Sequence, residues 1–462
     1  MYKAYVTSLK NVRPHSNADR MQLADCFGNT VCVGLDAKEN DVVIYFPTDG
    51  QLSVEYCAAN NLVRKKDEAG NNVGGYLDPD KRNVTAIRLR GEKSDGLVMP
   101  LESLAFTGVD VNEFKVGDMI DIVNGIEICR KYIPRSNKCS GGTSNGNKVR
   151  KKKVPVAPLF SEHADTEQLA YNLAAFKPGD QIEITLKMHG TSQRTAHLPV
   201  LKGYKRTLLD KILRREGTPI YDWGYVTGTR RTVLDDYEGG YYGSNEFREV
   251  HSKIFEGKLA AGEAVYYEVV GFTTNGTPIM PSSSNSKLND KEFIKQYGDT
   301  TVFSYGCTPT GKKTLYGEDE HGPFSIEEDV PQSDIYVYRM TMTNHEGVVV
   351  EYSPDFMRYR CEQMGVKCVP VFWKGYIPEN PGSTDDDTIS AGEWVANKVD
   401  LYCDGPDPIG KSHVREGVVV RIINRPKFAA YKHKNFSFKV LSGIAVDNIN
   451  PNEVSEDILS EM

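Results

Sequence analysis

The chain has 462 residues, of which 39% are hydrophobic and 26% are charged, a balance typical of a soluble globular protein of two or three domains. No apolar run approaches the roughly 20 residues of a membrane span, and the N-terminal segment MYKAYVTSLKN does not resemble a signal peptide, so we expect no membrane partner. The nine cysteines are scattered without a Cys-x-x-Cys pair, which disfavours a zinc site or a disulfide framework and favours a cytoplasmic protein.

The net charge of −7 argues weakly against a nucleic-acid partner, but the basic residues are concentrated. Residues 148–153 (KVRKKK) form a basic run, and the segments YKRTLLDKILRR and GTRR follow. Acidic stretches such as STDDDT and NEVSEDILSEM stand elsewhere in the chain. Because a charge run is usually a solvated face, this distribution permits a polyanionic partner without requiring one.

The first predicted elements are β-strands in the N-terminal part of the chain. Residues 21–35 (MQLADCFGNTVCVGL) read as a hairpin that turns at Gly28-Asn29, and residues 43–47 and 84–91 read as further strands. These strands favour a small β-barrel. The segment PHSNADRMQLADC followed by TVCVGL resembles the tRNA-binding kind of OB domain, which implies an oligonucleotide-binding face. A structural barrel docked on its neighbour is the alternative.

Residues 135–154 are rich in Ser, Gly, Asn and Lys and nearly devoid of apolar side chains, which predicts a linker between a domain at 1–134 and one at 155–462. The second domain contains predicted strands at 181–190, 224–231, 264–272, 301–306, 334–343, 347–353, 415–423 and 435–441. Helical patterns cover 167–176, 355–364 and 391–402. This mixture predicts an α+β domain built on mostly antiparallel sheets.

The segment ITLKMHGTSQR, residues 184–194, carries the first chemical signal. Apolar residues alternate from Ile182 to Met188, so a half-buried strand would turn Lys187 and His189 onto the opposite face, just before Gly190. A lysine with the reference pKa of about 10.4 becomes nucleophilic only where desolvation or neighbouring positive charge lowers that value. Lys-x-x-Gly alone is a common pattern, so a purely structural lysine is the alternative.

A nucleophilic lysine in this setting suits attack on a phosphorus or a carbonyl centre, and three downstream segments supply further charged groups for such chemistry. Glu268 lies in the strand pattern YYEVVG, and Glu416 lies in REGVVVR. Lys432 and Lys434 follow in YKHKNFSFK. A nucleophilic lysine, two strand-borne carboxylates and a basic pair form one coherent set.

This series resembles the covalent nucleotidyltransferases, namely ATP-dependent ligases and capping enzymes, with Lys187 in motif I, Glu268 in motif III, Glu416 in motif IV and Lys432 and Lys434 in motif V. The segments KMHGTS, EGVVVR and KHKNFSFK, together with the OB-type segment, resemble family 5 of the ATP-dependent RNA ligases, the Deinococcus and Naegleria type. The resemblance covers nearly the whole chain.

The resemblance implies that Lys187 attacks the α-phosphate of ATP, expels pyrophosphate and retains AMP through a phosphoramidate bond. Lys432 and Lys434 would neutralise charge on the α-phosphate, and their field would favour neutral Lys187. Glu416, together with Glu268, would hold a hydrated Mg²⁺ (or Mn²⁺). In family members the motif III carboxylate is otherwise placed near the ribose, so the role of Glu268 stays open.

Weaker motifs extend the implied ATP site. Arg230 or Arg231 in GTRR falls where the family has motif Ia, which implies a contact to ribose or phosphate, and Tyr338 in YVYR resembles motif IIIa, whose aromatic ring stacks on adenine. His189 stands where DNA ligases and capping enzymes carry Asp, so it can donate or accept hydrogen bonds but adds no charge when neutral; Gly190 completes the motif. Packing or surface roles are the alternatives.

A second copy of Glu-Gly-Val-Val-Val begins at Glu346, which therefore competes with Glu416 for the motif IV assignment. Only the later copy ends in Arg421 and precedes the lysine pair. Asn344 and Gly347 are turn-forming residues and predict a hairpin turn at the earlier copy. Position therefore favours Glu416.

The predicted function is that of an ATP-dependent RNA ligase, an enzyme of RNA repair that joins RNA 3′-OH and 5′-phosphate ends. The resemblance implies a nick in duplex RNA or an RNA-DNA hybrid as substrate, and no protein partner. An mRNA-capping guanylyltransferase would use GTP, but its OB domain follows the transferase core, whereas no barrel-sized segment follows Lys439. A non-catalytic tRNA-binding OB protein is the third interpretation, and it does not require the five motif residues to occur together.

Overall fold

A computed structural model describes most of the chain, and its strands and helices form two compact units. One unit contains Met1–Thr143, Ser284–Asp299 and Phe436–Met462, and the other contains Ser144–Ser283 and Thr300–Asn435. The predicted linker at 135–154 lies outside the described residues, so the predicted domain boundaries stay predictions. The described residues are 2–27, 29–48, 50–65, 74–132, 155–163, 166–208, 210, 217–230, 232–234, 237, 245–319, 322–381, 390–442 and 445–446.

In the first unit a four-stranded sheet has the order β10-β5-β1-β11, and its inward side chains form one apolar core with Leu52, Tyr56 and Leu104. The predicted hairpin is confirmed, because β3 and β4 pair antiparallel as far as Cys26↔Asn29; Asn29, predicted in the turn, begins β4. The predicted strand at 43–47 is β5, and that at 84–91 corresponds to β7 and β8. The strands described here fall into several small sheets, so a closed barrel is not confirmed. The strands and helices of this unit are β1 (Ala4–Ser8), β2 (Lys10–Pro14), β3 (Met21–Cys26), β4 (Asn29–Gly34), β5 (Val42–Phe46), β6 (Gly50–Leu52), α1 (Val54–Ala59), β7 (Asn83–Val84), β8 (Ala86–Leu89), β9 (Glu92–Asp95), β10 (Leu97–Pro100), β11 (Met119–Ile120), β12 (Ile122–Val123), β13 (Ile126–Glu127), β14 (Cys129–Lys131), α4 (Lys291–Tyr297), α7 (Phe436–Leu441) and β30 (Ala445–Val446).

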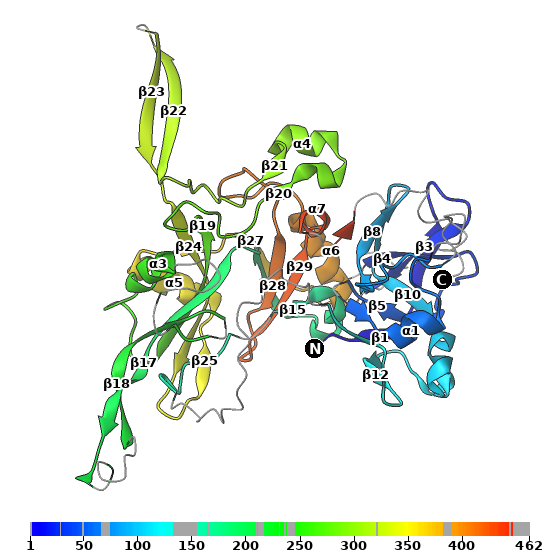
Figure 1. The fold of residues 1–462 in the computed structure, drawn as a ribbon, viewed down its shortest axis with the longest axis horizontal. Coiled ribbons are helices and arrows are strands. Elements are labelled where there is room, and N and C mark those ends of the chain that lie inside the picture. Colours follow the sequence, from blue (N-terminus) through cyan, green and yellow to red (C-terminus); the bar gives the residue numbers. More distant parts are fainter. Residues whose placement is uncertain are drawn as a thin grey trace. The chain divides into compact units, whose positions relative to one another are not determined.

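The second unit is built on two sheets, both visible in Figure 1. The first has the order β15-β29-β28-β16-β27, and the second has the order β18-β17-β19-β24-β25, with β26 also paired to β24. The pairs are antiparallel except β15 with β29 and β24 with β26. The predicted α+β class with mostly antiparallel sheets is confirmed. The strands are β15 (Glu167–Gln168), β16 (Gln181–Leu186), β17 (Thr191–Lys205), β18 (Thr218–Gly228), β19 (Glu263–Gly271), β21 (Thr300–Thr301), β24 (Ser333–Thr343), β25 (Val349–Glu351), β26 (Lys367–Cys368), β27 (Val371–Tyr376), β28 (Gly417–Ile422) and β29 (Ala429–Lys434); β20 (Ser283–Ser284) pairs with β21.

Two of the predicted helices are confirmed, and their caps explain their limits. Helix α5 (Pro354–Met364) begins after Ser353, whose side chain accepts the backbone N–H of Phe356, and ends before Gly365 in the left-handed conformation. Helix α6 (Ala391–Cys403) begins with a capping box between Ser390 and Glu393. The helix α3 (Glu246–Lys253) was not predicted.

Three predicted elements are wrong. Residues 167–176 form β15 and two 3₁₀ turns, at Leu169–Tyr171 and Leu173–Ala175, instead of a helix. Of residues 301–306 only Thr301 belongs to a strand. Residues 436–441 form helix α7, not a strand. The alternation of Phe436, Phe438 and Val440 imitates a strand, but in so short a helix all three side chains can reach the core and are buried.

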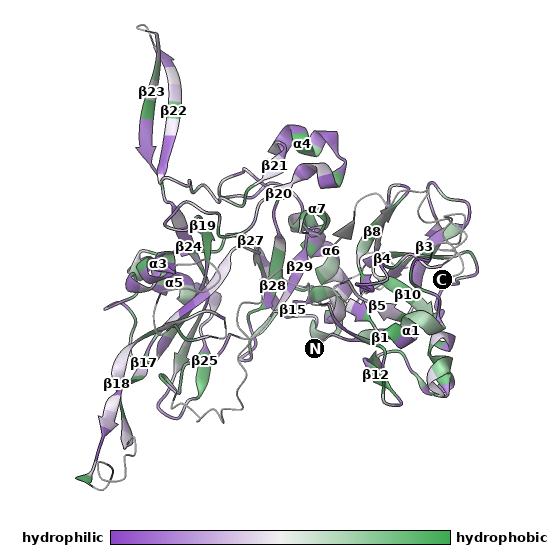
Figure 2. Ribbon diagram, viewed as in Figure 1, coloured by the Kyte–Doolittle hydropathy of each residue, from purple (hydrophilic) through white to green (hydrophobic). Residues whose placement is uncertain are grey.

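A hairpin of β22 (Lys312–Asp319) and β23 (Gly322–Asp329) projects from the second unit (Figure 1) and was not predicted. Hydrophilic residues predominate along it, with isolated hydrophobic ones (Figure 2). No described helix of the protein is long and apolar enough to cross a membrane.

Candidate active site

Lys187 follows the last residue of β16, a central strand of the five-stranded sheet. The predicted alternation is confirmed up to the strand end, because Ile182, Ile184 and Leu186 are buried in the core on one face while the side chain of Lys187 is 21% exposed. The backbone N–H of Lys187 donates to the carbonyl of Gly417 at 3.0 Å, which ties the lysine to the start of β28. Two adjacent strands therefore fix where Lys187 and residue 416 lie.

The carboxylate of Glu416 is the centre of a cluster of basic groups. Its Oε1 lies 2.7 Å from Nζ of Lys187 and 3.7 Å from Nζ of Lys434, and its Oε2 lies 3.4 Å from Nδ1 of His189. Burial alone would raise the pKa of Glu416, but the charges of Lys187, His189 and Lys434 outweigh it and hold that pKa well below the ordinary value. Glu416 is therefore an anion at neutral pH although its side chain is only 3% exposed.

Glu268, half-buried on β19 of the other sheet, is under the opposite influence. Burial first, and then the charge of Glu416, raises the pKa of Glu268 to about 7, against the lowering effects of Lys187, of the backbone N–H of Gly190 and of Arg248. Two carboxylates beside one lysine thus differ in their affinity for protons.

Gly190 allows the strand after Lys187 to approach β19 closely. A Cβ at this position would lie 2.3 Å from the carbonyl oxygen of Val269 and 2.9 Å from Cγ of Glu268, both far inside van der Waals contact. The glycine after the lysine therefore serves the contact between two protein segments in this structure.

A pocket of about 240 Å³ opens in front of Lys187, in the second unit. Five residues singled out from the sequence line it: Lys187, Arg230, Glu268, Tyr338 and Lys432. Glu416 and Lys434 do not line it but contact each other beside Lys187, and His189 contacts Glu416. Arg231 lies outside the described residues. The structure thus brings the described motif residues to one place, although they come from sequence positions as far apart as 187 and 434.

The pocket wall contains residues that were not predicted. Ser192 exchanges a 2.9 Å hydrogen bond with the hydroxyl of Tyr338, and it lies within the KMHGTS motif, so the motif could have indicated it. His163 lies 5.3 Å from the ring of Tyr338 between centroids, and no sequence signal points to it. Burial, then the charges of Arg339 and Arg230, lowers the pKa of His163 to about 3.

Glu346 is not part of this site. It is exposed in the turn between β24 and β25, where the side chain of Asn344 accepts the backbone N–H groups of Glu346 and Val348 at 3.0 and 2.8 Å. Gly347 has a positive φ of 83°. The predicted hairpin turn is therefore confirmed.

The acidic groups suit a metal ion that keeps most of its water. Within the described part of the chain, no group of three or more His, Cys, Asp or Glu side chains is arranged to hold a metal. Glu416 and Glu268 are carboxylates near Lys187. Oε2 of Glu416 is buried and lies 3.4 Å from Nδ1 of His189, and it has no hydrogen-bond partner among the described residues. Mg²⁺ is commonly bound through one or two carboxylates and several waters, so this donor set fits it.

Comparison with known proteins yields structural relatives only. No protein-family model and no curated protein matches the sequence. Among solved structures, a mutant Naegleria gruberi RNA ligase with AMP and Mn is similar, with 15% identity and a TM-score of 0.54 over 94% of this chain and 97% of that chain. The same ligase with PPi gives 15% identity and a TM-score of 0.52 over the same shares, and another mutant with ATP and Mn gives 15% and 0.51 over 96% and 98%. The chain therefore has an RNA ligase-like fold.

Proposed function

We propose that this protein is an ATP-dependent RNA ligase of the family 5 type, in which Lys187 carries AMP as a covalent intermediate. The observation that carries the proposal is the pocket lined by Lys187, Glu268, Lys432 and Tyr338. Oε1 of Glu416 forms an ion pair with Nζ of Lys187 at 2.7 Å. The RNA ligase-like fold over nearly the whole chain adds support.

In the first step Nζ of Lys187 attacks the α-phosphorus of ATP, so that an N–P bond forms and the bond to pyrophosphate breaks. Lys432 lines the pocket and neutralises charge that develops on the α-phosphate, and Lys434 acts from beside Glu416. Tyr338 stacks on the adenine, and Arg230 binds ribose or phosphate at the pocket wall, with Arg231 next in sequence.

Glu416, with Glu268, would hold a hydrated Mg²⁺ or Mn²⁺, which would supply positive charge for the phosphates. Oε1 of Glu416 is also the atom that pairs with Lys187. Positive charge held there would weaken the pairing of Glu416 with Lys187 and would favour loss of the ammonium proton of Lys187 to solvent, which leaves the neutral amine for attack. His189 orients Glu416 through the contact of Nδ1 with Oε2.

In the later steps AMP passes to an RNA 5′-phosphate, and a 3′-OH then displaces AMP to seal the strand. We propose a nick in duplex RNA or an RNA-DNA hybrid as the substrate, and an OB-type domain at residues 1–134 that binds nucleic acid, joined by a linker to an adenylyltransferase domain at 155–462. The basic segment at 148–153 supports a polyanionic partner. The reaction belongs in the cytoplasm.

The test is strand sealing by the full chain on a nicked duplex that carries a 3′-OH and a radiolabelled 5′-phosphate at the nick. With ATP and Mg²⁺ the wild-type protein is expected to lengthen the labelled strand, and Lys187→Ala is expected not to. Sealing that persists in Lys187→Ala would contradict the role of the lysine. Covalent labelling from GTP alone would instead identify a guanylyltransferase, and RNA binding without any reaction would identify a non-catalytic binding protein.

A further inference from the structure

The strand register places a row of side chains along the floor of the pocket, starting at Lys187. Side chains two residues apart in a strand share a face, so Glu183 and Thr185 lie on one face of β16, and Lys187, the first residue after the strand, continues this alternation. In β28, Val419 is opposite Thr185 and Arg421 is opposite Glu183. Four residues of strand separate Glu183 from Lys187 by about 13 Å. The pocket therefore has a phosphate end at Lys187 and a distant end at Glu183.

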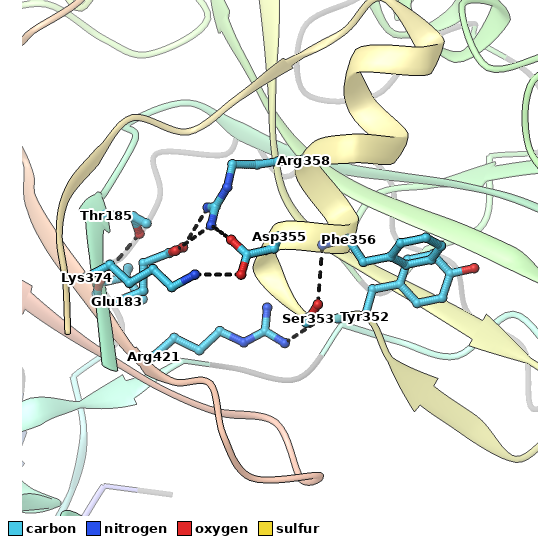
Figure 3. Close-up of polar contacts among 10 residues, drawn as sticks. Glu183, Thr185, Tyr352, Ser353, Asp355, Phe356, Arg358, Lys374 and Arg421 are labelled. Atoms are coloured by element: carbon cyan, nitrogen blue, oxygen red, sulfur yellow. Dashed lines mark hydrogen bonds and ion pairs between the residues drawn. The ribbon is translucent and has the colours of Figure 1, made fainter. Parts of the chain in front are cut away.

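The distant end is polar although it is buried. Glu183, 3% exposed, accepts a two-pronged pair of hydrogen bonds from Arg358 of α5, at 3.0 and 2.8 Å. Arg358 also donates to Asp355 at 2.7 Å, and Asp355 pairs with Lys374 at 2.6 Å. Figure 3 shows Arg358 reaching from α5 to the carboxylate of Glu183. Asp355 accepts from the same NH2 group of Arg358 that binds Glu183, and Lys374, opposite Glu183 on β27, holds Asp355, so the guanidinium and the carboxylate have fixed positions.

Arg421 lies beside this pair and keeps hydrogen-bonding capacity. Its NH2 group donates to the carbonyl of Tyr352 at 3.1 Å (Figure 3) and lies 3.7 Å from Oε2 of Glu351, but its Nε is buried and has no hydrogen-bond partner among the described residues. An ionised carboxylate also accepts more than the two hydrogen bonds that Arg358 donates to Glu183. Glu183, Arg358 and Arg421 all line the pocket, so a ligand reaching this end meets both an acceptor and donors.

Much of the remaining pocket wall is apolar or aromatic. Val419, Met357 and Ala430 line it, together with the rings of Tyr338 and Phe428. A flat heterocycle fits between aromatic and aliphatic side chains, and its polar edge then has to find partners at the distant end. A nucleotide whose α-phosphate meets Lys187 directs its base along this path.

We infer that Glu183, held in place by Arg358, selects adenine by accepting a hydrogen bond from its 6-amino group. This inference rests on the proposed function, because it takes Lys187 as the phosphate end. Guanine carries a carbonyl oxygen in place of that amino group, and the carboxylate repels it. Glu183 is thus a specificity-determining residue, and Arg358 is a positioning residue that acts through it.

The test compares binding of ATP with that of purine riboside 5′-triphosphate, which lacks the 6-amino group, by calorimetry. Lys187→Met serves as the background because it cannot form the covalent intermediate. We expect ATP to bind this protein about tenfold to a hundredfold more tightly than the analogue, the range for a hydrogen bond to a charged group. Adding Glu183→Gln is expected to bring the ratio close to one, because the amide oxygen turns to Arg358 and the NH₂ group faces the amino group of adenine.

The matched control is Glu263→Gln in the same background. Glu263 is equally buried and accepts hydrogen bonds from Arg360 at 2.9 and 2.8 Å, but it does not line the pocket. A purely structural loss of a buried ion pair would weaken binding of both nucleotides equally, so only the ratio reports base selection. If Glu183→Gln does not fold, the double variant Glu183→Leu/Arg358→Met replaces the pair by apolar side chains, which buried ion pairs commonly tolerate.

A ratio that is already near one before Glu183 is changed, or that Glu183→Gln leaves unchanged, would overturn the inference. Covalent labelling of the protein with Lys187 intact separates this failure from that of the proposed function. If ATP labels the protein but Glu183→Gln leaves the ratio of the two affinities unchanged, Glu183 does not select the base, and the ligase proposal is unaffected. If ATP binds more tightly than the analogue but does not label the protein, the covalent mechanism is contradicted and base selection by Glu183 is supported. If neither nucleotide binds, both proposals are contradicted.

Discussion

Replacing Glu268 by glutamine is expected to stabilise the protein at and above neutral pH. Burial, then the charge of Glu416, raises the pKa of Glu268 from the ordinary 4.5 to about 7. A group whose pKa is higher in the folded state contributes stability that is complete below the unfolded-state pKa and is lost as pH rises through the folded-state pKa. The wild-type protein therefore loses the contribution of Glu268 between about pH 4.5 and about pH 7.

The size of this effect follows from the two pKa values. The interval from 4.5 to 7, at about 1.4 kcal/mol per pH unit, sets an upper limit of about 3.5 kcal/mol. Because Glu268 is only half-buried, solvent reduces the penalty, and we expect Glu268→Gln to gain about 1–3 kcal/mol at pH 8 and little at pH 5. The amide oxygen of glutamine can still accept the backbone N–H of Gly190.

The assay is urea denaturation across this pH range, with the free energy of unfolding taken by linear extrapolation. Glu346→Gln is the control, because Glu346 is exposed in a turn outside the site. Activity of Glu268→Gln should fall while stability rises, as is common when a strained active-site charge is removed. A stability difference between wild type and Glu268→Gln that is the same at both ends of the pH range would refute the reasoning.

Three further changes test the site. Glu416→Gln should lower the stability of the protein above about pH 5, because the lowered pKa of Glu416 contributes stability that is lost only as the pH falls below the ordinary carboxyl range. Thermal melts measure this, and a stability loss in Glu416→Gln that stays the same in acid would contradict the expectation. Gly190→Ala should destabilise the protein by about 1–3 kcal/mol and slow its covalent labelling by ATP, because the added methyl group clashes with the carbonyl of Val269. An unchanged free energy of unfolding in urea would show that β19 can shift to accommodate the methyl group. Tyr338→Leu should weaken ATP binding about tenfold, whereas Tyr338→Phe, which keeps the ring, should bind nearly as wild type; equal calorimetric losses would point to the hydroxyl bonded to Ser192.

The sequence predicted the parts of the site that local pattern determines. The alternation from Ile182 to Leu186 identified the strand that ends just before Lys187, and the run of valines in β28 did the same for the strand after Glu416. Turn chemistry at Asn344 separated the exposed Glu346 from its buried counterpart. Each of these signals lies within a few residues of the feature that it predicts.

What the sequence did not predict depends on contacts between distant segments. Glu183 and Arg358 are 175 positions apart, and nothing near either residue shows that they meet at the end of the pocket. His163 likewise reaches the pocket through Arg339, 176 positions away. The helix at Phe436–Leu441 was mistaken for a strand because its apolar residues are nearly all buried and do not follow the helical spacing in the sequence. Tertiary packing, not local propensity, decided these cases.

In the proposed reaction Lys187 becomes the carrier of AMP. The most direct measurement is peptide mapping by mass spectrometry after the full chain has been incubated with ATP and Mg²⁺ and kept at neutral or alkaline pH, where a phosphoramidate survives. The account predicts an AMP group on the peptide that contains Lys187, lost when the sample is acidified and absent from Lys187→Arg. AMP on a different residue, or a protein that binds ATP and RNA without any covalent AMP, would contradict it.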